Sequence, residues 1–316
     1  MGSRRADGSG VKGVAVAGPD GGRRHSRRSV LLATASGLGV SVVAGGIATD
    51  TLPVGPAMHR TLGVASGPEP RPGRFRVERV YSAARGREVD LVTMLPTSSP
   101  RAGLPMALFL HGRGGSARAA APSGLLRQLA TDVARRAVPA FGFVAVDGGD
   151  HYWHENRPGD DPMRMLLEEV PRWLRDRGLG GADGSPFAAA GVSMGGFGAL
   201  LYARRRVERG RPPAAVAALS PALITTWAEM SKRRAFSGMR EWLALDPLRH
   251  VEALADVPTA VWCGTDDGFI PGVRRFIALA RPEIGYTARG GHGDGFYRTV
   301  LPSLVRFLGR YLPATP

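Results

Sequence analysis

The feature that most constrains the fold of this 316-residue sequence is a strand, a tight turn and a helix between residues 187 and 206. Residues 187–192 are small and apolar, which is typical of a buried strand, and residues 196–206 carry apolar side chains at helical spacing. Between them lies the G-x-S-x-G pattern, Gly191-Val-Ser193-Met-Gly195. A Cβ at either glycine would clash with backbone in so tight a turn, and the serine is forced into a strained conformation at the positive end of the helix. The sequence therefore predicts that Ser193 is a nucleophile at a nucleophile elbow.

A serine nucleophile needs a base, which we expect after it in the order serine, acid, histidine. Only His250 and His292 follow Ser193 in the chain. His292 lies in a glycine-rich loop, Arg289-Gly-Gly-His-Gly-Asp294, after the last predicted strand. His250 precedes the strand that should carry the acid, so it is out of order. We predict His292 as the base.

The acid should follow the penultimate predicted strand, where Asp266 and Asp267 are adjacent. Two neighbouring carboxylates cannot both face one imidazole. The acid commonly stands three residues beyond the glycine that ends the strand, here Gly264, which favours Asp267. Asp266 remains the alternative.

The oxyanion hole should combine the Met194 N–H with one from the glycine-rich loop at residues 111–115. We predict the Arg113 N–H, with the Gly114 N–H as the alternative, and expect His111 to lie beside the substrate. A phosphate-binding loop is excluded because no Gly-Lys-Ser/Thr follows.

Strands and helices alternate along most of the chain. Besides residues 187–192, we predict strands at residues 75–81, 88–95, 106–110, 141–146, 214–219, 259–262 and 284–288, the first two as a hairpin. Helices are predicted at residues 125–137, 163–177, 273–280 and 297–312. This alternation predicts an α/β fold whose mostly parallel central sheet has helices on both faces.

A longer segment, residues 222–254, lies where a lid is expected, between two predicted strands. Its apolar side chains recur three to four positions apart, which predicts short amphipathic helices. Their apolar face either completes the core or forms the wall of an acyl pocket. In the second case Trp227, Phe236 and Trp242 would face Trp153 across a substrate-binding pocket rimmed by arginine.

Residues 147–155 contain carboxylates and imidazoles that could bind a metal, namely Asp147, Asp150, His151, His154 and Glu155. They follow a strand and do not have the order of a zinc-protease helix. We expect no metal and no cofactor. Asp147 or Asp150 should bind nearby backbone, and residues 152–154 should line a pocket wall.

The N-terminal region resembles a twin-arginine export signal. Arg27 and Arg28 precede a weakly apolar run that ends near Ala48. We divide the chain into a signal region (1–48), a proline- and glycine-rich linker (49–73) and a catalytic domain (74–316). The sequence thus predicts a secreted or envelope-associated protein, with an uncleaved membrane anchor as the alternative.

Composition limits the partners. The net charge is +15, yet all but two of the 42 basic residues, Lys12 and Lys232, are arginine, and they are scattered along the chain. No basic stripe is interleaved with aromatic residues, so we expect no nucleic-acid partner. A basic surface favours anionic envelopes or substrates. Cys263 is the only cysteine, which excludes an intrachain disulfide.

Taken together, the loop 111–115, the segments 147–154 and 168–171, the elbow 191–198 and Gly291-His292 resemble the α/β-hydrolase superfamily. Within it the chain is most similar, over residues 75–312, to the esterase family that includes esterase D and the mycobacterial antigen 85 mycolyltransferases. The resemblance implies a serine esterase acting through an acyl-enzyme. Together with the export signal, it leads us to expect an exported enzyme that acts on a small-molecule or envelope-lipid ester.

Two other functions fit the same fold: an acyltransferase with a sugar or alcohol acceptor, and a non-catalytic envelope-binding protein. The antigen 85 enzymes lack a Gly-Gly after the elbow methionine, so transfer to trehalose is not implied. Esterase D members are cytosolic and act on thioesters, which disagrees with an export signal.

Overall fold

The computed structural model describes residues 73–97 and 101–313. The predicted signal region (1–48) and nearly all of the predicted linker (49–73) lie outside the described residues. Within the described ranges, no helix is both long enough and apolar enough to span a bilayer.

The core of the structure is one eight-stranded sheet with the strand order β1-β2-β4-β3-β5-β6-β7-β8. β1 pairs antiparallel with β2 and β2 antiparallel with β4, and all other neighbours are parallel. The mostly parallel sheet predicted from the sequence is therefore confirmed. The strands are Arg74–Ser82 (β1), Arg87–Leu95 (β2), Met106–Leu110 (β3), Gly142–Val146 (β4), Ala188–Val192 (β5), Ala215–Leu219 (β6), Thr259–Gly264 (β7) and Ile284–Ala288 (β8).

The central strands are buried on both faces, which explains why they read as unbroken apolar runs. In β3, Leu108 and Leu110 belong to the core on one side of the sheet, whereas Ala107 and Phe109 belong to the core on the other. This is the period of two expected of a strand.

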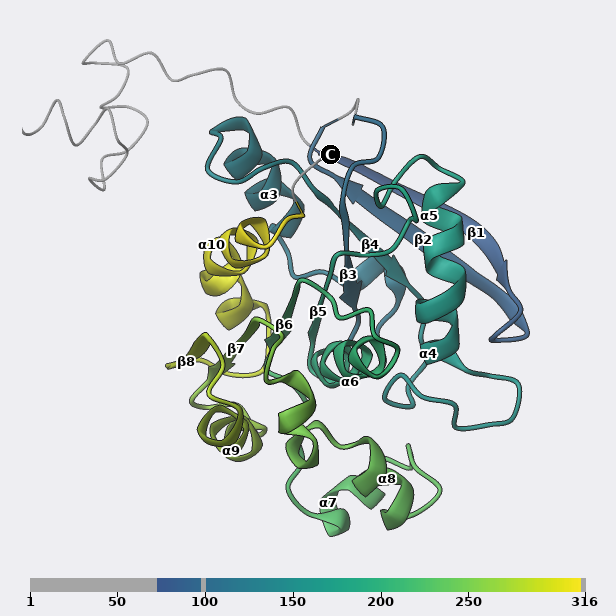
Figure 1. The fold of residues 1–316 in the computed structure, drawn as a ribbon. Coiled ribbons are helices and arrows are strands. Elements are labelled where there is room, and N and C mark those ends of the chain that lie inside the picture. The colour runs from purple at the N-terminus through teal and green to yellow at the C-terminus, as the bar shows by residue number, and fades with distance from the viewer. Residues whose placement is uncertain (1–72, 98–100, 314–316) are drawn as a thin grey trace, which may run out of the picture. The chain divides into compact units, whose positions relative to one another are not determined.

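Helices cover both faces of the sheet (Figure 1). α3 and α10 pack in one core, and α6, α9 and the segment from α4 to α5 pack in the other. The bounds are Leu125–Ala134 (α3), Pro162–Arg164 (α4), Val170–Arg175 (α5), Met194–Glu208 (α6), Ile270–Ala280 (α9) and Asp294–Arg310 (α10), with a short 3₁₀ turn at Ala117–Ala119.

Two of the observed helices differ from the helices predicted from the sequence. The helix expected at residues 163–177 is interrupted by a π-helix, Met165–Glu169, between α4 and α5. The helix expected from residue 196 begins at Met194, because Gly195, Gly196 and Gly198 are used for close packing and not for a loop.

The predicted lid segment contains α7 (Trp227–Ser231), α8 (Met239–Leu245) and two 3₁₀ turns, Pro247–Arg249 and Val251–Leu254. Its apolar face completes the core. Phe236 and Trp242 are only 8% and 2% exposed and belong to the same buried cluster as the apolar residues of α6 and α9. Trp242 is therefore a core residue here, and the expectation that it lines a substrate pocket is wrong for this structure.

Candidate active site

Ser193 occupies a strained turn between β5 and α6. Its φ of 56° and ψ of −121° are unusual for a residue with a side chain. A Cβ on Gly191 would lie 2.3 Å from the Gly195 oxygen, and one on Gly195 would lie 2.0 Å from the Leu110 oxygen. Both glycines are therefore needed for the close approach of α6 to the sheet.

Backbone hydrogen bonds fix this turn to the neighbouring strand. The Ser193 N–H donates to the Leu219 oxygen at the end of β6, at 2.9 Å. The Ala222 N–H in turn donates to the Ser193 oxygen, also at 2.9 Å. The strained conformation is thus held from both sides of the serine.

Asp267 and His292 form a hydrogen-bonded pair. His292 Nδ1 lies 2.7 Å from Asp267 Oδ2, and the Phe269 N–H donates to Asp267 Oδ1 at 2.9 Å. The Asp267 side chain is 1% exposed, whereas the His292 side chain is 36% exposed. Asp266 is exposed and makes no contact with the imidazole. Asp267, and not its neighbour, is placed to orient the histidine.

The surroundings of Asp267 keep its carboxyl group ionised. Burial raises its pKa, but the hydrogen bonds from His292 and from the Phe269 N–H outweigh that effect and lower the pKa below the ordinary value. An ionised carboxylate holds the proton of His292 on Nδ1 and leaves Nε2 available as a base.

Two aromatic rings hold the imidazole in place. Phe269 meets the His292 ring edge-on at 5.1 Å between centroids, and Tyr297 does so at 6.0 Å. The sequence reasoning missed both residues. The only available signal was proximity, since Phe269 follows Asp267 by two positions and Tyr297 follows His292 by five.

Ser193, Asp267 and His292 follow β5, β7 and β8, so all three lie at the carboxyl edge of the parallel strands. Within the described residues the Ser193 hydroxyl makes no hydrogen bond. Hydrogen bonds between catalytic groups often form only when substrate binds, so the lack of this bond does not exclude His292 as the base for Ser193.

Two N–H groups near Ser193 are available to an oxyanion. Met194 is the first residue of α6, so its N–H has no acceptor inside the helix. The Arg113 N–H has no partner among the described residues, whereas the Gly114 N–H donates to Asp150 Oδ1 at 2.6 Å. A Cβ on Gly112 would lie 3.3 Å from Ser193 Cβ, so this loop directly adjoins the nucleophile.

The buried His111 ring links the loop 111–115 to the loop that follows β4. It is 1% exposed, its Nδ1 lies 2.8 Å from the Gly112 oxygen, and its Nε2 accepts the Gly148 N–H at 2.9 Å. Because Nε2 accepts a hydrogen bond, the ring is neutral with its proton on Nδ1. Burial lowers the pKa of His111 and so favours this neutral form. The expectation that His111 touches substrate is wrong here, because its ring is enclosed.

Trp153 is likewise a core residue. Its side chain is fully buried, and added Cβ atoms on Gly148 and Gly198 would each lie 2.3 Å from its ring. The ring also packs 4.9 Å from His111. Trp153 therefore joins the loop after β4 to α6, and the expectation of a substrate-binding Trp153 is corrected in the same way as that of Trp242.

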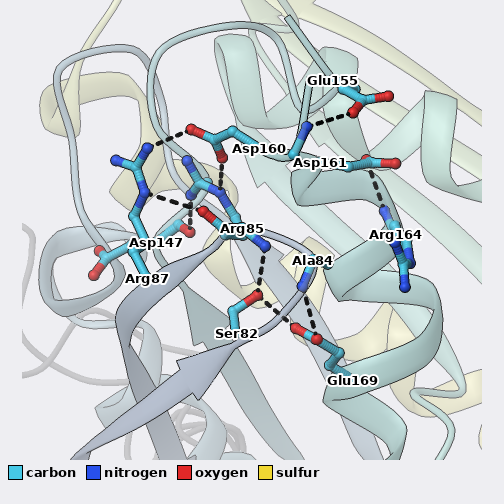
Figure 2. A network of polar contacts seen from close by, with 12 residues as sticks. Ser82, Ala84, Arg85, Arg87, Asp147, Glu155, Asp160, Asp161, Arg164 and Glu169 are labelled. Atoms are coloured by element: carbon cyan, nitrogen blue, oxygen red, sulfur yellow. Dashed lines mark hydrogen bonds and ion pairs between the residues drawn. The ribbon is translucent and has the colours of Figure 1, made fainter. Parts of the chain in front are cut away.

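A polar network fixes the loop between β4 and α4 to the β1–β2 turn (Figure 2). Arg85 donates to the Asp147 backbone oxygen at 2.6 Å and pairs with Asp160 at 2.5 Å. Glu169 of the π-helix accepts the Ala84 N–H at 2.9 Å and the Ser82 hydroxyl at 2.5 Å. The network was not predicted, because its members are far apart in the sequence.

The acidic residues that we considered as metal ligands bind the backbone. Asp147 accepts the N–H groups of Asp90 and Ala117, and Asp150 accepts that of Gly114. His154 is 5% exposed, and its Nε2 lies 2.9 Å from the Ala235 oxygen. Across the described ranges, no group of three or more His, Cys, Asp or Glu side chains is arranged to hold a metal ion.

Solved structures with the same fold are numerous. A ferulic acid esterase superposes with a TM-score of 0.63 at 19% identity, covering 76% of this chain and 99% of that chain. An S-formylglutathione hydrolase from Agrobacterium tumefaciens superposes with a TM-score of 0.61 at 16% identity, covering 77% of this chain and 96% of the hydrolase. For a fluorophosphonate-binding serine hydrolase of Staphylococcus aureus the TM-score is 0.56 at 16% identity, and the match covers 75% of this chain and 98% of the hydrolase.

At the level of sequence, none of the curated proteins matches significantly. The family described as "Putative esterase" matches residues 82–272, which is more than half of the chain and includes the elbow and Asp267. With the eight-stranded sheet and the strained serine in place, the chain belongs to this esterase family of the α/β-hydrolase fold and is a carboxylic ester hydrolase.

Proposed function

We propose that the protein is an exported serine esterase that works through an acyl-enzyme, with Ser193, His292 and Asp267 as its catalytic triad. The observation that carries the proposal is the 2.7 Å hydrogen bond between His292 and the buried Asp267 at the same sheet edge as the strained Ser193. An orienting acid, a half-exposed imidazole and a constrained serine are the parts that ester cleavage by a serine requires.

In the first half of the reaction, Ser193 Oγ attacks the ester carbonyl carbon while His292 Nε2 takes the hydroxyl proton. The Met194 and Arg113 N–H groups stabilise the negative oxygen of the tetrahedral intermediate. The intermediate then expels the alcohol, which receives the proton from His292, and leaves the acyl group on Ser193.

In the second half, water attacks the acyl-enzyme with His292 again acting as the base. Exposure of 36% of the imidazole supports water as the acceptor, because solvent reaches the base directly. A sugar or alcohol acceptor would use the same steps and would make the protein an acyltransferase. We favour hydrolysis and take a small-molecule or envelope-lipid ester as the substrate.

The experiment is a series of p-nitrophenyl esters from acetate upwards, with and without glycerol or trehalose as acceptor, for the wild type and Ser193→Ala. We expect turnover by the wild type only, with no ester product formed on the acceptor. Equal rates for the two proteins would refute the triad, and acceptor-dependent ester synthesis would identify a transferase.

Export is a separate part of the proposal and rests on Arg27 and Arg28, which lie outside the described residues. Replacing both by lysine should leave precursor in the cytoplasm. Secretion at the wild-type level would exclude the twin-arginine route. N-terminal sequencing of the exported protein would show whether it is cut near Ala48 or retained as an anchor.

A further inference from the structure

A cavity of about 290 Å³ lies at the end of α6 that is remote from Ser193. A helix rises about 1.5 Å per residue, so the part of α6 between Ser193 and Arg206 spans about 20 Å. Because β6 follows α6 and runs parallel to β5, this end of α6 lies at the amino edge of the strands, opposite to the candidate active site. The cavity is lined by residues of the π-helix, of the loop that leads into β5 and of the C-terminal end of α6, namely Leu167, Ser185, Arg206, Arg209 and Arg211.

Arg206 is held in the wall of this cavity by neutral acceptors. Its Nη1 donates to the Tyr202 hydroxyl at 2.8 Å, and its Nε donates to the Arg211 backbone oxygen at 2.6 Å. A third acceptor is the Pro186 oxygen, 3.4 Å from Nη1. Among the described residues, no carboxylate forms an ion pair with Arg206, and its Nη2 makes no hydrogen bond. The guanidinium is thus fixed in place, charged and with one nitrogen available to a ligand.

The other two arginines of the cavity are exposed and at most weakly paired. Arg209 lies 3.4 Å from Glu168, and the two side chains are 48% and 44% exposed. Exposed ion pairs of this kind contribute about 1 kcal/mol or less, so Glu168 does not hold Arg209 strongly. Arg211 is exposed and forms no ion pair within the part of the chain that the structure describes. Both side chains are therefore available to a bound anion.

Arginine exceeds acid throughout this part of the amino edge. Residues 172–187 lead from the end of α5 into β5, and residues 204–214 lead from the end of α6 into β6; together they contain eight arginines and three acids. One of these acids, Asp183, already accepts the hydroxyl and the N–H of Ser185, at 2.8 and 2.9 Å. The C-terminal ends of the two helices add only about half a negative charge each. The excess of positive charge remains and attracts anions towards the cavity.

We propose that this cavity binds a phosphate monoester, either a soluble one or the headgroup of an anionic lipid. A guanidinium offers two parallel N–H donors that fit two oxygens of an anion. A carboxylate has two oxygens and one charge, whereas a phosphate monoester has three free oxygens and up to two charges. The phosphate is therefore the anion that can engage more than one of the three arginines. The site does not depend on the proposed esterase function, because it shares no residue with the candidate active site.

The first experiment is calorimetric titration of the intact chain with glycerol 3-phosphate, and with glycerate as the carboxylate comparator. We expect the phosphate to bind at least about 10-fold more tightly than glycerate. In the double variant Arg209→Gln/Arg211→Gln, its Kd should rise by at least about 10-fold, because two charged donors are lost. Arg211→Lys should retain part of the affinity, since lysine keeps the charge but not the paired donors. Arg206 is left unchanged because its contacts support the end of α6.

The matched control is Arg274→Gln/Arg275→Gln, which removes two exposed charges from α9, outside the cavity. Its Kd for glycerol 3-phosphate should equal that of the wild type. An equal loss of affinity in the two double variants would show a general attraction by the basic protein and would overturn the site. Equal affinities of the wild type for glycerol 3-phosphate and glycerate would overturn the choice of phosphate.

Sedimentation with lipid vesicles distinguishes the two sources of the phosphate. The wild type and both double variants are mixed with phosphatidylcholine vesicles, with and without about 20% phosphatidic acid. If only the binding of glycerol 3-phosphate depends on Arg209 and Arg211, the ligand is a soluble ester. If the binding of phosphatidic acid vesicles depends on them, the cavity takes a lipid headgroup. Binding that is unchanged by Arg209→Gln/Arg211→Gln in both experiments would overturn the proposal.

Discussion

Asp266 and Asp267 are adjacent in the sequence, yet only Asp267 contacts the imidazole of His292. Both of its carboxylate oxygens accept hydrogen bonds, one from Phe269 and one from His292, and its side chain is almost completely buried. Asp266, one residue earlier, is exposed. The two carboxylates differ because the turn after β7 directs only the second towards the imidazole.

We predict that Asp267→Asn lowers kcat by about 10³- to 10⁴-fold, because the amide favours the wrong tautomer of His292. Asp266→Asn is the matched control and should change kcat by no more than about 3-fold. Steady-state kinetics on a p-nitrophenyl ester measures both. A large loss in Asp266→Asn together with near wild-type activity in Asp267→Asn would reverse the assignment.

His111 links stability to pH. Burial lowers the pKa of its imidazole in the folded state relative to the unfolded state. Between the folded pKa and the unfolded value of about 6.5, the unfolded chain binds more protons. The stabilisation is therefore fully present above pH 6.5 and is lost as the pH falls below it.

We predict that the free energy of unfolding decreases between pH 7.5 and pH 5.5, and decreases less steeply in His111→Asn, which has no imidazole to titrate. One proton accounts for at most about 1.4 kcal/mol per pH unit. Denaturant titrations at a series of pH values give this slope. Equal slopes in the two proteins would show that His111 does not contribute to the pH dependence.

The role of a single residue could be predicted from the sequence where it depends only on the local turn. The crowding at Gly191 and Gly195 and the strained φ of Ser193 follow from the turn itself and are present in the structure. The sequence did not predict the burial of His111 and Trp153. Aromatic residues after a strand can line a pocket or fill a core, and only the tertiary contacts distinguish the two.

At the level of elements, the π-helix Met165–Glu169 is the least expected feature. It places Glu169 where its two oxygens reach Ser82 and Ala84 of the β1–β2 turn. A regular helical pattern was predicted there, because apolar periodicity does not distinguish a single wider turn. The predicted strands match the observed ones closely. β3 to β7 are buried apolar runs followed or ended by polar or glycine residues, whereas the edge strands β1 and β8 are only partly buried.

We predict that Glu169→Leu destabilises the protein by about 2–4 kcal/mol, because the Ala84 N–H and the Ser82 hydroxyl lose their acceptor in a buried site. Glu168→Leu removes only exposed ion pairs with Arg164 and Arg209 and should cost less than about 1 kcal/mol. Chemical denaturation of both variants measures the difference. Equal effects would mean that the Glu169 contacts contribute no more than surface pairs.

At the scale of the whole molecule, the parallel strands bring distant residues to one edge. Ser193 follows β5, Asp267 follows β7 and His292 follows β8, and the loop after β3 adds Arg113. Carboxyl ends of parallel strands are where open α/β sheets bind ligands. The sequence predicted this assembly from chain order, whereas the role of the lid as core could be decided only from its packing.

The central claim is that Ser193 becomes acylated with His292 as its base, and covalent trapping tests it most directly. The protein is treated with a fluorophosphonate, and the modified peptide is identified by mass spectrometry for the wild type, Ser193→Ala and His292→Ala. We predict one adduct, on Ser193, in the wild type, none in Ser193→Ala and labelling slowed by at least about 100-fold in His292→Ala. An unlabelled wild type, or an adduct on another residue, would contradict the account.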